Sequence, residues 1–308
     1  MSSTFPLALG LDAGGTRTRW ALVRPDGELQ AQGQAGGCSG LMMASAPGRA
    51  QMAAVWADVV AQTAPHGKLL GLCAGLTGFD GDAGSSLSAC MAKAFAVDAR
   101  RIRLFNDIEL ACRAAFAPGQ GYLVYAGTGS VAAHVDEQEV LHRAGGRGGL
   151  IDDGGSGYWI AREALRHIWR AEDEAPGAWR TSAMAQAVFD VVGGSDWSST
   201  RSWVYGASRG QLGELALAVA AAARATKPDA AARQILVHAG EELARLAAAL
   251  LKRHGTRPLR LAGRVFDLHP CIEAALRDAL PPQLDIQSPG ELAAHRAAAL
   301  IASKEVAP

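Results

Sequence analysis

The sequence predicts an α/β protein made of two similarly built domains. Apolar runs typical of buried strands alternate with segments whose apolar residues have helical spacing, which is the pattern of an α/β layer. The glycine-tipped hairpin LGLDAGGTRTRWALV at 9–23 has a counterpart, GYLVYAGTGSVAAHV at 121–135, which indicates an internal repeat. With 308 residues, of which 49% are hydrophobic, the chain is long enough for two domains that each have a core.

The first half opens with a hairpin and continues as alternating strands and helices. The segment 48–64 is expected to be a helix because Met52, Val55 and Val59 follow helical spacing. The strands are expected at 6–12, 18–24, in the stretch after 24, at 68–76 and at 102–107, and the other helices at 85–96 and 108–117.

The second half repeats the hairpin and then becomes mainly helical. Helical stretches are expected at 158–169, 181–192 and 211–253, and a late strand ends at Gly263. After a proline-rich break, the last helix, 291–302, is expected to return to the first domain. We therefore predict an N-terminal domain of residues 1–117, completed by a helix within 290–304, and a C-terminal domain of residues 118–289.

Composition excludes several classes of partner. Thirty basic and 30 acidic residues cancel, so no nucleic-acid partner is expected. The five cysteines are scattered and form no Cys-x-x-Cys pair, which is typical of reduced thiols rather than of a disulfide framework or a zinc site. No secretory leader and no apolar run long enough to cross a bilayer is expected, so we predict a cytoplasmic protein without a membrane partner.

The two glycine turns are candidate phosphate-binding sites. Backbone N–H groups in such turns form concave anion-binding surfaces, to which a threonine hydroxyl adds a donor. The first turn holds Gly14, Gly15 and Thr16, and the second holds Gly127, Thr128 and Gly129. Asp12 would repel a phosphate directly, so its expected partner is Mg²⁺ or the water shell of that ion.

The sequence fits two other nucleotide-binding motifs less well. The stretch GTGSVA at 127–132 also fits the Gly-x-Gly-x-x-Ala dinucleotide fingerprint, but that motif requires a helix, and the residues that follow alternate like a hairpin. It also leaves the opening turn unexplained. No Gly-x-x-x-x-Gly-Lys-Ser/Thr sequence is present, which excludes a P-loop.

Two further stretches carry carboxylates at positions that favour catalysis or substrate binding. Asp107 lies where a strand gives way to a helix, which is typical of a helix N-cap, but a carboxylate there can also accept a proton from an attacking hydroxyl, and both roles can coexist. The loop 144–157 is rich in glycine, contains Asp152 and Asp153, and leads into a helix whose N-terminus is positive. A glycine-lined loop with carboxylates suits the hydroxyls of a polyol.

These motifs together resemble those of a known family. DAGGT at the first hairpin, ND at the end of a strand, AGTGS at the second hairpin, GGRGGLIDDGGSGYWI and a late AG occur in this order. The chain resembles the BadF/BadG/BcrA/BcrD family within the actin-like ATPase and sugar-kinase fold, above all its N-acetylglucosamine and glucosamine kinases. The resemblance implies two RNase H-like domains, with ATP and sugar in a cleft between them, and a homodimer.

The resemblance also implies roles for individual residues. Asp107 matches the catalytic base. Asp12, Gly14, Gly15 and Thr16 match the first phosphate loop, Gly127, Thr128 and Gly129 the second, and Gly263 the loop near adenosine. Positions on the sugar side are matched by Ser39, Asp107, Ser130, Gly146, Arg147 and Asp153.

Several residues depart from the family pattern. Ser39 is the nearest polar residue where relatives have Asn, Arg147 stands where N-acetylglucosamine kinases tend to carry Trp, and Arg264 follows Gly263. Asp152-Asp153-Gly154-Gly155-Ser156 replaces the Gly-Asp-Glu-Gly-Ser of many relatives. The resemblance therefore implies an ATP- and Mg²⁺-dependent kinase for the 6-hydroxyl of N-acetylglucosamine or glucosamine. The alternatives are an ATPase that activates a dehydratase or reductase, and a non-catalytic amino-sugar sensor.

Overall fold

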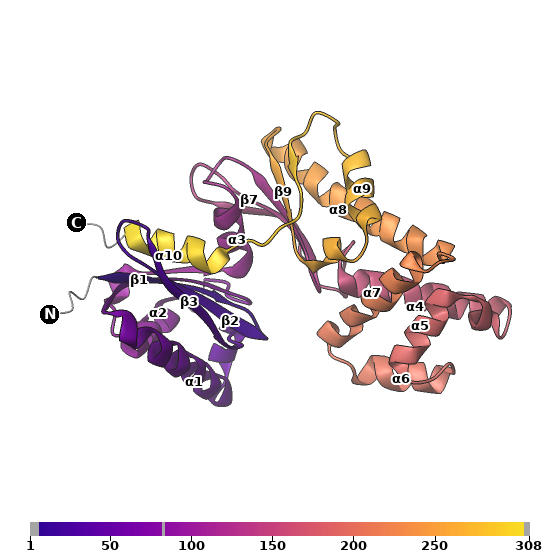
Figure 1. Cartoon of the computed structure of the whole chain (residues 1–308), viewed down its shortest axis with the longest axis horizontal. Helices are drawn as coiled ribbons and strands as arrows, with labels where there is room; N and C mark the ends of the chain where they lie inside the picture. Colours follow the sequence, from indigo (N-terminus) through magenta and orange to yellow (C-terminus); the bar gives the residue numbers. More distant parts are fainter. Residues whose placement is uncertain (1–5, 82–83, 305–308) are drawn as a thin grey trace. The chain divides into compact units, whose positions relative to one another are not determined.

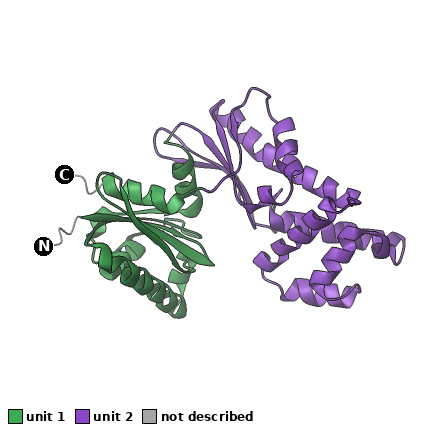
Figure 2. Ribbon diagram, viewed as in Figure 1, with its two compact units in different colours: residues 1–118, 292–308 green, residues 119–291 purple. Residues whose placement is uncertain are grey.

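The computed structural model describes residues 6–81 and 84–304, which form two compact units. Unit 1 contains residues up to Pro118 together with the segment from Leu292, and unit 2 contains Gly119–Glu291 (Figure 2). In the described ranges, no helix is both apolar enough and long enough to span a membrane.

Unit 1 is a five-stranded sheet covered on both faces by helices. The strand order is β3-β2-β1-β4-β5, in which β1, β4 and β5 are parallel and β2 and β3 are antiparallel to their neighbours. Its main elements are β1 (Leu7–Ala13), β2 (Arg17–Val23), β3 (Leu29–Gly36), α1 (Ala46–Thr63), β4 (Leu69–Leu76), α2 (Gly84–Phe95), β5 (Ile102–Asn106), α3 (Asp107–Ala115) and α10 (Ala294–Lys304).

The alternation along β1 decides which helices cover each face. Leu7, Leu9 and Leu11 pack in a core with residues of α1 and α2, whereas Ala8 packs with α10 on the other face. Gly10 lies on this second face, and a Cβ there would be 2.1 Å from the backbone nitrogen of Ala299. The small residues let α10 lie directly on the sheet, on the side opposite α1 (Figure 1).

Unit 2 repeats the same sheet. Its order is β8-β7-β6-β9-β10, with β6, β9 and β10 parallel and β7 and β8 antiparallel to their neighbours, which confirms the predicted internal repeat. Its main elements are β6 (Tyr122–Ala126), β7 (Ser130–Val135), β8 (Leu141–Gly145), α4 (Gly157–Glu174), α5 (Ala183–Val192), α6 (Trp197–Gly206), α7 (Arg209–Arg224), α8 (Ala230–His254), β9 (Leu259–Ala262), α9 (Pro270–Asp278) and β10 (Ile286–Gln287).

The helices predicted for unit 2 need three corrections. The stretch 211–253 is not continuous: α7 ends before Pro228, and Asp229 starts α8 by accepting a hydrogen bond from the backbone N–H of Ala232 (3.1 Å). Helix α6 was not predicted, because it has no apolar stripe and only Thr200 in it is buried. Helix α9 was not predicted either, and the other helices lie near their expected positions.

Candidate functional site

Parallel strands gather three polar residues at one edge of the sheet in unit 1. Adjacent parallel strands end at the same edge, and in open α/β sheets ligands bind outside these carboxyl ends. Asp12 is the penultimate residue of β1, Thr77 follows β4 and Asp107 follows β5. Thr77 was not among the predicted site residues, because a lone threonine after a strand gives no pattern.

Asp107 is the first residue of α3, and its carboxylate accepts a hydrogen bond at each oxygen. Oδ2 accepts the Thr77 hydroxyl at 2.7 Å, and Oδ1 accepts the backbone N–H of Ile108 at 2.9 Å. The predicted N-cap role belongs instead to Asn106, whose side chain accepts from the N–H of Glu109 at 2.9 Å. Because Asn106 caps the helix, the Asp107 carboxylate does not serve as the cap. The hydrogen bond from Thr77 holds this carboxylate at the sheet edge.

Asp12 is mostly buried and lies near other charged side chains. Burial raises the pKa of Asp12, the nearby charge of Asp107 raises it further, and Arg19 and Arg17 oppose these effects. Two carboxylates that repel each other at a sheet edge favour a bound cation. Within the described ranges, no group of three His, Cys, Asp or Glu side chains could hold a metal ion. The residues fit Mg²⁺, which is commonly held by one or two carboxylates, waters and phosphate oxygens.

The first glycine turn joins β1 to β2 and is tied to the segment after β3. The N–H of Gly14 donates to the carbonyl of Arg17 (3.0 Å), and its own carbonyl accepts from Cys38 (2.9 Å). Gly37 packs so closely that a Cβ there would be 2.1 Å from the carbonyl oxygen of Gly15. Gly15 and Thr16 remain exposed at the tip of a turn that is fixed from behind.

The second glycine turn, between β6 and β7, supports the start of α4. Its carbonyls at Gly127 and Thr128 accept the N–H groups of Gly157 (2.8 Å) and Tyr158 (3.3 Å), while the Ser156 hydroxyl accepts that of Trp159 (3.1 Å). The positive N-terminus of this helix was expected to serve the site. Instead its first three N–H groups are satisfied by the turn and by the cap, so they position the turn and do not face a ligand.

Asp153 is brought against the second turn by a strained loop. It is a non-glycine residue at φ 57°, its side chain is buried, and its Oδ1 accepts the N–H of Gly148 at 3.1 Å. Its Oδ2 forms an ion pair with Nη2 of Arg209, the first residue of α7. A Cβ at Gly129 would lie 2.9 Å from Oδ2 and 2.7 Å from Nη2, so turn, carboxylate and guanidinium are in contact.

The sequence does not single out Arg209. The expected helix began at 211, and an arginine in the first turn of a helix has no feature that distinguishes it from a surface residue. The available sign was Ser208, which caps α7 in a reciprocal capping box with Gln211.

The remaining predicted residues of unit 2 lie around the same turn. The Ser130 hydroxyl donates to the carbonyl of Gly154 (2.7 Å), and its backbone carbonyl accepts from Gly146 (2.9 Å). Gly146 and Arg147 are exposed. Gly263 has φ +100°, and a Cβ on it would be 2.2 Å from the carbonyl oxygen of Ala126, so only glycine lets β9 end beside the turn.

Ser39 has a local structural role in unit 1. Its hydroxyl oxygen accepts the N–H of Leu41 (3.2 Å) and so caps the short helix Gly40–Ala44, while the carbonyl of Thr77 accepts from Gly40 (2.9 Å). The segment that carries Ser39 is therefore tied to the end of β4, at the sheet edge where Thr77 and Asp107 lie.

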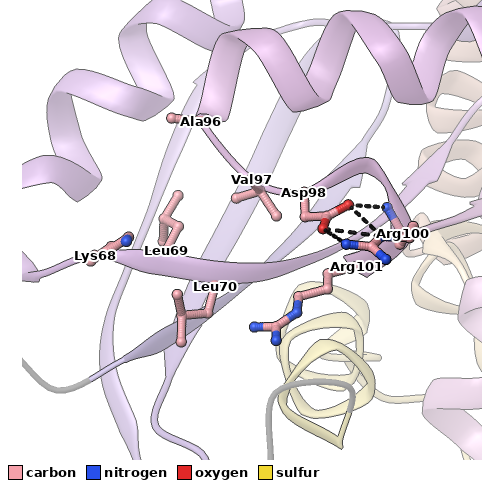
Figure 3. A pocket seen from close by; sticks show the side chains of 8 residues that line it. All are labelled: Lys68, Leu69, Leu70, Ala96, Val97, Asp98, Arg100 and Arg101. Carbon is pink, nitrogen blue, oxygen red and sulfur yellow. Dashed lines mark hydrogen bonds and ion pairs between the residues drawn. The ribbon is translucent and has the colours of Figure 1, made fainter.

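A surface cavity of about 460 Å³ lies at the other edge of the unit 1 sheet (Figure 3). It adjoins the amino ends of β4 and β5, and it contains the ion pair between Asp98 and Arg100 at 2.7 Å. The residues that line it are Lys68, Leu69, Leu70, Ala96, Val97, Asp98, Arg100 and Arg101. Because the strands separate it from Asp12 and Asp107, this cavity is not part of the candidate site.

Comparison with solved structures confirms the predicted fold of two RNase H-like, actin-like ATPase domains. A structure from Chromobacterium violaceum, provisionally assigned as an N-acetylglucosamine kinase, is 27% identical, has a TM-score of 0.73 and covers 97% of this chain and 99% of its own. A ROK family glucokinase from Streptomyces griseus, solved with glucose and AMPPNP, has a TM-score of 0.58 at 15% identity, with 97% and 98% coverage, and shows the fold alone.

Sequence comparison gives the family. An N-acetyl-D-glucosamine kinase of Dictyostelium discoideum is 25% identical over 187 residues, which are 60% of this chain and 57% of the relative, so the match spans little more than half of that protein. The sequence model of the BadF/BadG/BcrA/BcrD ATPase family matches residues 9–284, a range that contains both glycine turns, Asp107 and Asp153. Since that match takes in both units, the chain belongs to the BadF/BadG/BcrA/BcrD ATPase family.

Proposed function

We propose that this protein is an ATP- and Mg²⁺-dependent kinase that phosphorylates the 6-hydroxyl of an amino sugar, N-acetylglucosamine or glucosamine. The observation that carries the proposal is the sheet edge of unit 1, where Asp107 is fixed by Thr77 and the pKa of Asp12 is raised by burial and by the charge of Asp107. Such an edge suits one cation and one proton acceptor. The family and the similarity to N-acetylglucosamine kinases support the choice of phosphoryl transfer to a sugar.

In this mechanism, Asp107 is the general base. Its carboxylate takes the proton of the sugar 6-hydroxyl as the oxygen bonds to the γ-phosphorus and the bond to the β-phosphate oxygen breaks, which gives ADP and a sugar 6-phosphate. Thr77 holds the carboxylate in position through the hydrogen bond to Oδ2. Mg²⁺, when bound, would neutralise developing charge on the phosphates, and Asp12 would hold it through its water shell.

The glycine turns are assigned to the phosphates. Gly14, Gly15 and Thr16 present an exposed turn in unit 1, and Gly127, Thr128 and Gly129 present the other in unit 2. Backbone N–H groups and threonine hydroxyls are the donors that such turns offer to an anion. Gly263, at the end of β9 beside Ala126, is assigned to the adenosine side.

The sugar side is assigned to polar residues of both units. Asp153 and Arg147 lie on the glycine-rich loop, with Ser130 and Gly146 hydrogen-bonded to each other beside it. Ser39 is assigned to the sugar from unit 1. The hydroxyls of a sugar donate well to a carboxylate such as Asp153. The specificity of the protein for an amino sugar over a plain hexose would come from Arg147 and Ser39, where the chain departs from its relatives.

An iron–sulfur ATPase activator is a poorer interpretation. Such an activator shares a cluster across a dimer through cysteines beside the nucleotide site, and the candidate that the sequence offers is Cys112 on α3. Its side chain is only 6% exposed, so it could not ligate a cluster shared with a second copy without local unfolding. The homodimer implied by the resemblance and the cytoplasmic location predicted from the sequence both stay predictions. Size-exclusion chromatography with light scattering tests the first.

A coupled ADP-release assay tests the proposed function. The purified protein is assayed with ATP, Mg²⁺ and a panel that includes N-acetylglucosamine, glucosamine, N-acetylmannosamine and glucose. We expect sugar-dependent ADP release that is fastest with one of the first two, and ³¹P NMR of the product should show a 6-phosphate. Equal rates on all four sugars would contradict amino-sugar specificity, and sugar binding without ADP release would indicate a sensor.

A further inference from the structure

The ion pair between Asp153 and Arg209 joins two parts of the proposed site, and the inference drawn from it rests on the proposed function. Asp153 is assigned to the sugar and Gly129 to the phosphates of ATP. In unit 2 the guanidinium of Arg209 contacts both, since its Nη2 pairs with Oδ2 of Asp153 and lies 2.7 Å from the position of a Cβ on Gly129.

The two partners differ sharply in exposure. The side chain of Asp153 is 2% exposed, whereas that of Arg209 is 46% exposed. A carboxylate has about four acceptor positions, of which the N–H of Gly148 and the guanidinium each take one. Because the rest of the carboxylate is buried, a sugar hydroxyl reaches Oδ2 from the side where the exposed guanidinium lies, so the hydroxyl replaces the guanidinium as a donor.

The position beside Gly129 gives the displaced guanidinium a second partner. A guanidinium carries five N–H donors and binds phosphate oxygens with good geometry. Arg209 is the first residue of α7, which is capped by Ser208, so its backbone is fixed while its side chain can turn. The guanidinium carbon of Arg209 also lies over the ring of Tyr158, 5.8 Å from the ring centroid.

We propose that Arg209 couples sugar binding to ATP binding by exchanging between the Asp153 carboxylate and the terminal phosphate of ATP. Both ligands favour the same rotamer, the one in which the ion pair is open. The first ligand to bind bears the cost of opening the pair, and the second does not, so each raises the affinity for the other. The coupling factor is limited by the strength of the pair, which predicts about tenfold to a hundredfold.

The experiment measures that factor by isothermal titration calorimetry. The dissociation constants of N-acetylglucosamine and glucosamine are measured with and without saturating AMPPNP and Mg²⁺, for the wild type and for Arg209→Gln and Arg209→Lys. Arg245→Gln is the matched control, because Arg245 pairs with Asp152 of the same loop at 3.0 Å and has a similar exposure of 52%. Thermal unfolding of each variant reports on its folding.

The wild type and Arg245→Gln should bind sugar about tenfold or more tightly with AMPPNP. Arg209→Gln should bind sugar alone at least as tightly as the wild type and gain nothing from AMPPNP, while Arg209→Lys should keep part of the gain. A purely structural Arg209 predicts the reverse, with weaker sugar binding and unchanged coupling, and that result would overturn the proposal. A wild type that phosphorylates sugar without coupling would also overturn it, whereas a wild type without sugar-dependent turnover would refute the proposed function itself.

Discussion

The Asp107→Asn substitution separates the role of the carboxylate as a base from its role in the fold. Asparagine keeps one oxygen, which can still accept the backbone N–H of Ile108, as Oδ1 does at 2.9 Å. Its NH₂ group then faces the Thr77 hydroxyl, which donates to Oδ2 at 2.7 Å in the wild type and which can rotate to accept instead. The shape and most of the hydrogen bonding are preserved, and the proton acceptor is lost.

The two expected magnitudes differ enough to be told apart. One weakened hydrogen bond costs about 0.5–1.5 kcal/mol of stability. Loss of a general base lowers kcat by about 10²–10⁴, which corresponds to about 3–5 kcal/mol of transition-state stabilisation. Because neither phosphate turn includes Asp107, the affinity for AMPPNP should change little.

The assay combines kcat from ADP release, the dissociation constant of AMPPNP and the midpoint of thermal unfolding. Asp98→Asn is the control, because it makes the same chemical change at the other edge of the same sheet, and it should leave kcat unchanged. If Asp107→Asn keeps kcat within about threefold of the wild type while folding normally, Asp107 is not the base and the proposed mechanism is wrong.

Three further outcomes are expected. Burial and the charge of Asp107 raise the pKa of Asp12, so Asp12→Asn should raise the thermal midpoint measured without Mg²⁺ and abolish Mg²⁺-dependent turnover; a lower midpoint would contradict this. The activity of the wild type should fall as pH drops through the raised pKa of Asp12. Gly263→Ala should destabilise unit 2 by about 2 kcal/mol or more in urea unfolding, because it combines φ +100° with a clash at Ala126, and a neutral result would show that the strand end can shift. Burial lowers the pKa of His254 below 6.5, so its neutral form stabilises the fold above pH 6.5, and this stability is lost as pH falls below that value. The free energy of unfolding in urea should therefore decrease less between pH 7.5 and pH 5.5 in His254→Gln than in the wild type.

The predicted fold followed from patterns that act over short distances. Alternation of Leu7, Leu9 and Leu11 with small residues is enough to give a strand with two unlike faces, and the same arrangement of apolar run and glycine turn at 121–135 gives the repeat. Such patterns are local because side-chain direction depends on the backbone of a few neighbouring residues. Helix α6 escaped them, because its sequence has no apolar stripe.

The sequence predicted only some of the residues of the candidate site. Asp12, Asp107 and the glycines stand out since few other residue types suit a tight turn or a proton acceptor at a strand end. Thr77 and Arg209 do not stand out, because a lone hydroxyl or a lone arginine is ordinary on any surface. The sequence also does not reveal the backbone geometry at the start of α3, where the N-cap residue is Asn106 rather than Asp107.

By itself, the sequence determined most strands, most helices, the two glycine turns and the family. The tertiary structure decided which side chains meet: Thr77 reaches Asp107 across 30 positions, and Arg209 reaches Asp153 across 56. Strand order and helix packing create these contacts, and both depend on the burial of the whole core rather than on neighbours in the chain. Local propensity therefore specifies the elements, while the packing of the finished sheet specifies the partners of each charged group.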